Sequence, residues 1–145
     1  MSDAQTPSPI QLPSAVVELE VPFHDVDAMN VVWHGHYVKY FEIARCKLLD
    51  QIDYNYVQMR DSNYAWPVIN LQVKYVRAIA FQQKIVVHAQ MLEWEHRLRI
   101  RYKITDAATG AKLTTGLTDQ VAVDLTTQEM QLVSPPIVAH KLGLD

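Results

Sequence analysis

The side chains with the most chemical potential lie between residues 24 and 37, which read HDVDAMNVVWHGHY. The segment holds two carboxylates and three imidazoles: Asp25, Asp27, His24, His34 and His36. A helical pattern begins at its end, and a helix N-terminus presents unpaired N–H groups and a partial positive charge. Such a terminus can hold a developing oxyanion while a nearby carboxylate attacks a carbonyl or deprotonates a water. The segment therefore favours chemistry on a carbonyl group.

The element that must position these groups is a long apolar helix, expected from about Gly35 to Ile52. Its apolar residues recur at i, i+3 and i+4 spacing. They form one stripe, made of Tyr37, Tyr40, Phe41, Ala44, Leu48 and Ile52. Further apolar residues broaden the stripe and leave only a narrow polar face. A helix with this pattern must be surrounded by other structure on most sides.

The other periodic segments are typical of strands. One precedes the helix at 15–23, and four follow it at 68–78, 84–94, 97–105 and 112–125. A hairpin turn is expected at 106–110, a short helical piece within 53–63, and another helix after the Pro135-Pro136 pair. This order predicts an α+β fold, in which an antiparallel sheet of about five strands wraps around one long central helix.

The motif from Asp25 to Arg45, D-x-D-A-x-x-V-V-W-H-G-H-Y-x-K-Y-F-E-x-A-R, resembles the signature of the hotdog-fold acyl-CoA thioesterases. The similarity is to the 4-hydroxybenzoyl-CoA thioesterase type, including its Tol–Pal-associated relatives. It is strongest over residues 23–45, and the order and lengths of the following strands extend it over most of the chain. The resemblance implies the hotdog fold and hydrolysis of an acyl-CoA or acyl-carrier-protein thioester.

The resemblance also implies roles for individual residues. Asp27 corresponds to the catalytic carboxylate, acting as nucleophile or general base, and the backbone N–H of His34, with Gly35 beside it, to the oxyanion donor. No metal or redox cofactor is implied. Coenzyme A is part of the substrate and is not a cofactor. A homodimer or homotetramer with the site at a subunit interface is implied. Many relatives carry Gly where this chain has Met29 and Asn30, so we expect a different loop or acyl pocket.

Structural explanations compete with these roles. Asp27 could be a turn residue that accepts backbone N–H bonds, and Asp25 is expected to hold the turn. The histidines and Asp27 could ligate a metal, but their spacing matches no metal motif, so no metal site is predicted. Glu42 and Arg45 are expected to pair within the helix, with Glu42 a minor catalytic candidate. Cys46 is expected in the core.

Substrate-binding residues are sought among basic and aromatic side chains. Arg97, Arg99, Arg101 and Lys103 alternate along the 97–105 strand. They form either a solvated strand face or a platform for the phosphates of coenzyme A or an acidic carrier protein, for which we take Arg97 and Arg99 as candidates. Trp33, Tyr64 and Trp66 are candidates for an acyl or aryl pocket, although aromatic residues beside strands are more often core.

Composition bounds the remaining classes of function. The chain has 145 residues, 49% of them hydrophobic, and a net charge of −3, which suits one domain with its own core. Residues 1–14 hold three prolines and are expected to be a flexible tail before a domain at 15–145. With no basic tract, apolar span or secretory signal, we expect a cytoplasmic protein without nucleic-acid partners. Two rival functions remain open: a hotdog hydratase or dehydratase, and a non-catalytic acyl-thioester-binding module.

Overall fold

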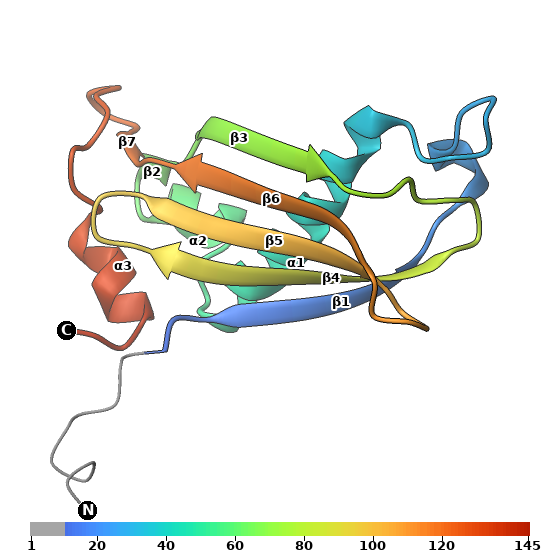
Figure 1. Cartoon of the computed structure of the whole chain (residues 1–145). Helices are drawn as coiled ribbons and strands as arrows, with labels where there is room; N and C mark the ends of the chain where they lie inside the picture. Colours follow the sequence, from blue (N-terminus) through green and yellow to red (C-terminus); the bar gives the residue numbers. More distant parts are fainter. Residues whose placement is uncertain (1–10) are drawn as a thin grey trace, which may run out of the picture.

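A curved antiparallel sheet wrapped around one helix makes up most of the structure, a computed structural model that describes residues 11–145 (Figure 1). The five strands follow the order β1-β4-β5-β6-β3 across the sheet. These elements are β1 (Ser14–Glu20), α1 (Tyr37–Gln51), β3 (Val68–Tyr75), β4 (Lys84–Glu93), β5 (Leu98–Asp106) and β6 (Lys112–Gln120). The predicted α+β fold is confirmed.

Helix α1 is buried because its apolar stripe faces the concave side of the sheet. Phe41, Ala44 and Leu48 are fully buried. The helix begins two residues later than predicted, because a 3-10 turn, η3 (His34–His36), precedes it. In this turn the N–H of His36 donates to the carbonyl of Trp33 three residues back, at 2.9 Å.

Strand β5 shows the alternation that the sequence predicts. Leu98, Ile100, Tyr102 and Ile104 point toward α1 and are fully buried. Its basic residues point to the opposite, outer face of the sheet. Two other strands end earlier than predicted: β3 ends at Tyr75 and β6 at Gln120. β6 ends at Gln120, which pairs with the first residue of β5, so no partner strand continues the ladder beyond it.

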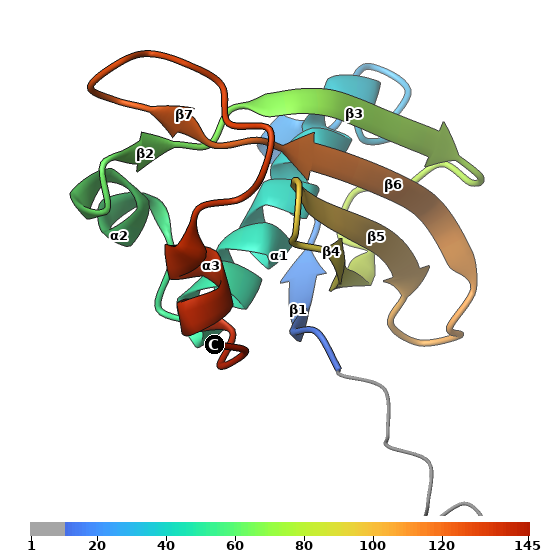
Figure 2. The ribbon, with the colours of Figure 1, turned by 90° about the vertical axis from the view of Figure 1, so that its left-hand side faces the viewer.

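Smaller elements gather at the C-terminal end of α1 (Figure 2). They are α2 (Tyr56–Asp61), β2 (Tyr64–Ala65), β7 (Val123–Asp124) and α3 (Pro136–Lys141). Asn55 and Gln58 form a capping box at the start of α2. Pro136 is the first residue of α3, as the double proline predicts. The segment with the candidate catalytic residues, including η2 (Phe23–Asp25), lies at the other end of α1.

Most of the predicted N-terminal tail lies outside the described residues. Its last part does not behave as a tail, because β1 begins at Ser14. The side-chain amide of Gln90 donates to the carbonyl of Leu12 at 3.1 Å, and the N–H of Met91 donates to the carbonyl of Pro13 at 3.0 Å. The chain is therefore held against β4 from Leu12 onward. No helix within residues 11–145 is long and apolar enough to span a bilayer.

Helix and sheet come into close contact at Gly116 of β6. The ring of Phe41 lies against its Cα and stacks on Tyr102 with centroids 4.6 Å apart. A Cβ added at Gly116 would lie 2.3 Å from Phe41 Cε2 and 3.2 Å from the backbone oxygen of Gln72. Neither ring has free space, because both are fully buried.

We expect Gly116→Ala to lower the free energy of unfolding by about 1–3 kcal/mol, as overpacking of a filled core does. Urea unfolding measures the change. In the same background Phe41→Leu should recover part of the loss, since it removes the clashing ring atoms. An alanine variant as stable as the wild type would show that the ring pair can move aside.

Candidate active site

The segment between β1 and α1 folds back on itself as a short hairpin. Val26 pairs with Val32, and the N–H of Asp27 donates to the carbonyl of Val31 at 2.9 Å. Asn30 takes a φ of 63°, the left-handed region that glycine and asparagine enter most readily. Asn30 therefore takes a backbone conformation that glycine also adopts readily.

Asp27 is exposed at the tip of this hairpin. Its Oδ1 accepts the N–H of Met29 at 2.8 Å, which is a side-chain turn of the kind that Asp commonly forms. The turn interpretation and the catalytic interpretation are thus compatible, because the turn occupies one carboxylate oxygen and orients the other.

Asp25 is 1% exposed and ties the hairpin to α1. Its carboxylate accepts hydrogen bonds from Lys39 Nζ and from the Tyr40 hydroxyl, the latter at 2.7 Å. Burial raises the pKa of this carboxyl, but the hydrogen bonds from Lys39 and Tyr40 outweigh burial and lower the pKa below its ordinary value. Asp25 therefore has the turn-holding position that the sequence predicts for it.

The 3-10 turn η3, which leads into α1, presents backbone donors at a fixed place. Within residues 11–145, no hydrogen-bond partner accepts from the N–H of His34 or Gly35. Trp33 covers Gly35 so closely that an added Cβ would lie 2.1 Å from Trp33 Cζ3. The Tyr75 hydroxyl donates to the carbonyl of His34 at 2.8 Å, and the Tyr75 ring packs edge-on against Tyr37. The donors are therefore rigidly held and open.

A hollow of about 210 Å³ lies beside these donors. It is lined by Val32, His34, Tyr37, Tyr75, Val76, Arg77 and Ala78. Tyr75 and Arg77 did not emerge from the sequence as site residues, because they lie some forty residues beyond His34. The sequence indicates only that the 68–78 strand ends near them. That this end lies beside the start of the helix becomes apparent only in the folded sheet.

Two predicted pocket residues lie elsewhere. Tyr64 and Trp66 are at the opposite end of α1, which at 15 residues is about 22 Å long. Trp66 is 6% exposed and donates through Nε1 to the Tyr54 hydroxyl at 3.0 Å. Within one chain the structure brings neither residue to His34, and Trp66 is part of the core.

The two arginines predicted to bind substrate are engaged by acids of the sheet. Arg99 contacts the buried carboxylate of Asp119 through Nε at 2.8 Å and through a terminal nitrogen at 3.0 Å. This hydrogen-bonded pair lowers the pKa of Asp119. Arg97 Nε contacts Glu93 at 2.9 Å. Both arginines thus have structural partners, while Arg101 and Lys103 remain exposed.

Three polar residues lie near the middle of α1: Glu42, Arg45 and Cys46. Arg45 is 2% exposed, with Glu42 at 3.5 Å and the Tyr56 hydroxyl at 3.4 Å, so the expected helix pair forms with a buried guanidinium. Cys46 is partly buried. In the part of the chain that the structure describes, no three His, Cys, Asp or Glu side chains are grouped as a metal site.

The profile of the family described as "Thioesterase-like superfamily" matches residues 21–141. The chain belongs to this superfamily. The thioesterase is 32% identical over 127 residues to "Putative esterase sll0410" of Synechocystis sp., covering 87% of this chain and 76% of that protein. It is 27% identical over 71 residues to "Putative acyl-CoA thioesterase YneP" of Bacillus subtilis, covering 49% of this chain and 51% of that protein.

Solved structures agree with this membership. A DHNA-CoA thioesterase from Staphylococcus aureus matches with a TM-score of 0.73 at 26% identity, over 81% of the thioesterase and 78% of that chain. Slr0204 of Synechocystis, a 1,4-dihydroxy-2-naphthoyl-CoA thioesterase, matches with a TM-score of 0.80 at 16% identity, over 90% and 96%. The predicted hotdog fold and the class of thioester hydrolase are confirmed.

Tyr40→Phe tests the tie at Asp25. A hydrogen bond to a charged group contributes about 1.5–3 kcal/mol, so the free energy of unfolding should fall by this amount at neutral pH. Because folding lowers the pKa of Asp25, the stabilisation is present above the ordinary value of 3.8 and is lost as the pH falls through the lower folded-state value. Urea unfolding over a pH series should show the difference from wild type shrinking in acid.

Tyr37→Phe is the matched control. The Tyr37 hydroxyl accepts the N–H of Ile79 at 3.3 Å, and neither group titrates in acid. Its effect on stability should not follow the protonation of Asp25. A Tyr40→Phe effect that stays constant down to the acid limit would assign the loss to packing instead.

Proposed function

We propose that this thioesterase hydrolyses acyl-CoA thioesters, with Asp27 as nucleophile or general base and the N-terminus of α1 as the oxyanion hole. The observation that carries the proposal is the pair of open N–H groups of His34 and Gly35, on the same short segment as the exposed carboxylate of Asp27. The names of the Bacillus subtilis and Staphylococcus aureus proteins support coenzyme A as the thiol portion.

The bond changes follow from this arrangement. With Asp27 as general base, the carboxylate takes a proton from water while the water oxygen bonds to the thioester carbon. With Asp27 as nucleophile, its own oxygen bonds to that carbon, and water later hydrolyses the mixed anhydride. In both cases the oxyanion accepts the N–H groups of His34 and Gly35. The carbon–sulfur bond then breaks, and the thiolate leaves and takes up a proton from solvent.

The braces around the helix start explain how the donors are preorganised. The Tyr75 hydroxyl holds the carbonyl of His34, and the Trp33 ring covers Gly35, so the peptide units cannot rotate freely. Donors that are already oriented cost no reorganisation during the reaction, and one such donor contributes about 2.7–4 kcal/mol.

Asp27→Asn is expected to lower thioesterase turnover about a hundredfold or more, because an amide neither attacks nor accepts the proton. The asparagine Oδ1 still accepts the N–H of Met29, so the hairpin and the melting temperature should be preserved. Turnover is measured by thiol release alongside thermal melting.

Asp124→Asn is the matched control, because Asp124 forms the same kind of turn with the N–H of Thr126 at the far end of the fold, at 2.8 Å. Its turnover should equal that of wild type. Near-normal turnover in folded Asp27→Asn would remove Asp27 from the mechanism. Single-turnover hydrolysis in heavy-oxygen water tests its role as nucleophile: label in Asp27 establishes the anhydride, with water attacking its Asp27 carbon, because the general-base route never labels Asp27.

We also propose that the thioesterase is a dimer or tetramer whose subunits meet at β3. The sheet has two edges, β1 and β3. On β3 and the residue after it, large apolar side chains remain 43–56% exposed: Val68, Ile69, Leu71, Tyr75 and Val76. An unpaired apolar edge strand is a template for pairing with another chain. Because β3 leads directly into the hollow at His34, pairing there would place the site at an interface.

Leu71→Asp should give a monomer with greatly reduced turnover, because a charge at this edge opposes pairing. Multi-angle light scattering at micromolar concentration gives the mass. Val16→Asp, on the other edge, is the control: Val16 is 46% exposed and Leu71 is 44% exposed, and the control should leave mass and turnover unchanged. An active wild-type monomer would contradict the proposal.

A further inference from the structure

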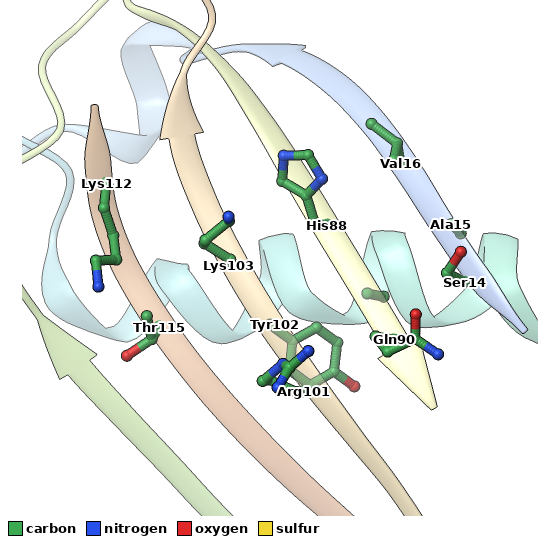
Figure 3. A pocket seen from close by; sticks show the side chains of 11 residues that line it. Ser14, Ala15, Val16, His88, Gln90, Arg101, Tyr102, Lys103, Lys112 and Thr115 are labelled. Atoms are coloured by element: carbon green, nitrogen blue, oxygen red, sulfur yellow. The ribbon is translucent and has the colours of Figure 1, made fainter. Parts of the chain in front are cut away.

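The outer face of the sheet carries a cluster of exposed cations. Lys74 on β3, Arg101 and Lys103 on β5, and Lys112 on β6 form this cluster, here called the basic face. Figure 3 shows three of them together with His88 on the side of the strands away from α1. Cross-strand register places His88, Lys103, Thr115 and Lys74 in one row across four strands.

The basic face has no acid of its own. In the described part of the chain, none of its four cations forms an ion pair, whereas Arg97, just before β5, and Arg99, near the start of β5, are both paired. The outward acids lie at the margins. Glu93 and Asp119 are taken by those arginines, and Glu18 and Glu20 are on the edge strand β1. Positive charge is thus gathered on this face although the whole chain has a net charge of −3.

His88 lies in the same row, beside Lys103. Burial is the main cause that lowers its pKa, and Lys103 lowers it further. A neutral His88 therefore adds a hydrogen-bonding group, and not another cation, to the centre of the face. The neighbouring outward residues are uncharged: Ser14, Val16, Gln72, Gln90, Thr115 and Leu117.

Like charges this close repel one another, which limits the occupants of the face. A second copy that packed the same face against it would bring four cations against four, so self-association there is disfavoured. The row from β3 to β4 crosses three strand spacings, about 14 Å. Two open hollows, of about 370 and 380 Å³, share Arg101 and Thr115. A broad, shallow and mostly lysine surface suits a large anionic surface better than the enclosed fork that grips one phosphate.

We propose that the basic face docks an acidic protein, namely a carrier protein that presents the acyl thioester on its phosphopantetheine arm. This proposal rests on the proposed function, because it supplies that reaction with a second form of substrate. The position of the basic face relative to the site supports this proposal. Lys74 directly precedes Tyr75, whose hydroxyl holds the carbonyl of His34, so one corner of the face adjoins the hollow at the oxyanion donors.

Docking through exposed charges should depend on the salt concentration. Interactions between exposed charges are screened over about 10 Å at 0.1 M salt, so the affinity for a carrier protein should fall as salt rises. Removing exposed charges at an interface changes mainly the rate of association and its salt dependence. Asp27 is not part of the basic face, so the chemistry there should be unaffected.

The test compares one acyl group on three thiols: a carrier protein, coenzyme A and N-acetylcysteamine. The double variant Arg101→Gln/Lys103→Gln should raise KM for the carrier-protein substrate about tenfold at low salt, as loss of steering charges does. It should leave KM for N-acetylcysteamine and coenzyme A thioesters, and kcat for all three, close to wild type. The matched control Lys47→Gln/Arg60→Gln removes two exposed charges from the helical side and should change none of these values.

Three results would overturn the proposal. Equal rises for the carrier-protein and coenzyme A substrates would assign the face to phosphate. No rise would make it a solvated strand face, and an equal rise in the control would assign the effect to net charge.

If wild type hydrolyses none of the three thioesters, the proposed function fails, and fluorescence anisotropy with labelled holo-carrier protein decides the docking by itself. Binding that the double variant loses supports docking, and binding that is absent or unchanged contradicts it.

Discussion

The buried carboxylate of Asp25 is the contact on which the geometry of the site depends. Its side chain accepts from Lys39 and Tyr40 on α1, and its backbone carbonyl accepts the N–H of Trp33 at 3.0 Å. One residue therefore joins both arms of the hairpin to the helix. A buried charge is tolerated only when it is paired and hydrogen-bonded, so this tie admits few competing arrangements.

The backbone donors of the 3-10 turn before α1 are divided between structure and chemistry. In the 3-10 turn the N–H of His36 is used to close the turn, while those of His34 and Gly35 stay open. Every helix leaves such donors at its first turn. Here they are exposed beside a hollow and fixed by aromatic side chains, which makes an ordinary feature of a helix suitable for holding an oxyanion.

The sequence predicted what depends on local pattern. The apolar stripe of α1 and the alternation of β5 follow from side-chain periodicity, and the motif placed Asp25, Asp27 and His34 on one segment. Features that depend on strand register were missed. The partner of Arg99 is Asp119, twenty residues away on β6, and the brace on His34 comes from Tyr75 at the end of β3. Neither neighbour can be located until the order and register of the strands are known.

The hairpin at residues 26–32 combines a fixed base with an exposed tip. Its base is locked by the Val26–Val32 pair and by Asp25, whereas Ala28, Met29 and Asn30 at its tip are exposed. Exposed loop tips tolerate replacement and insertion because little of the fold rests on them. Evolution or protein engineering can therefore vary the tip while the carboxylate beside it keeps its anchored backbone.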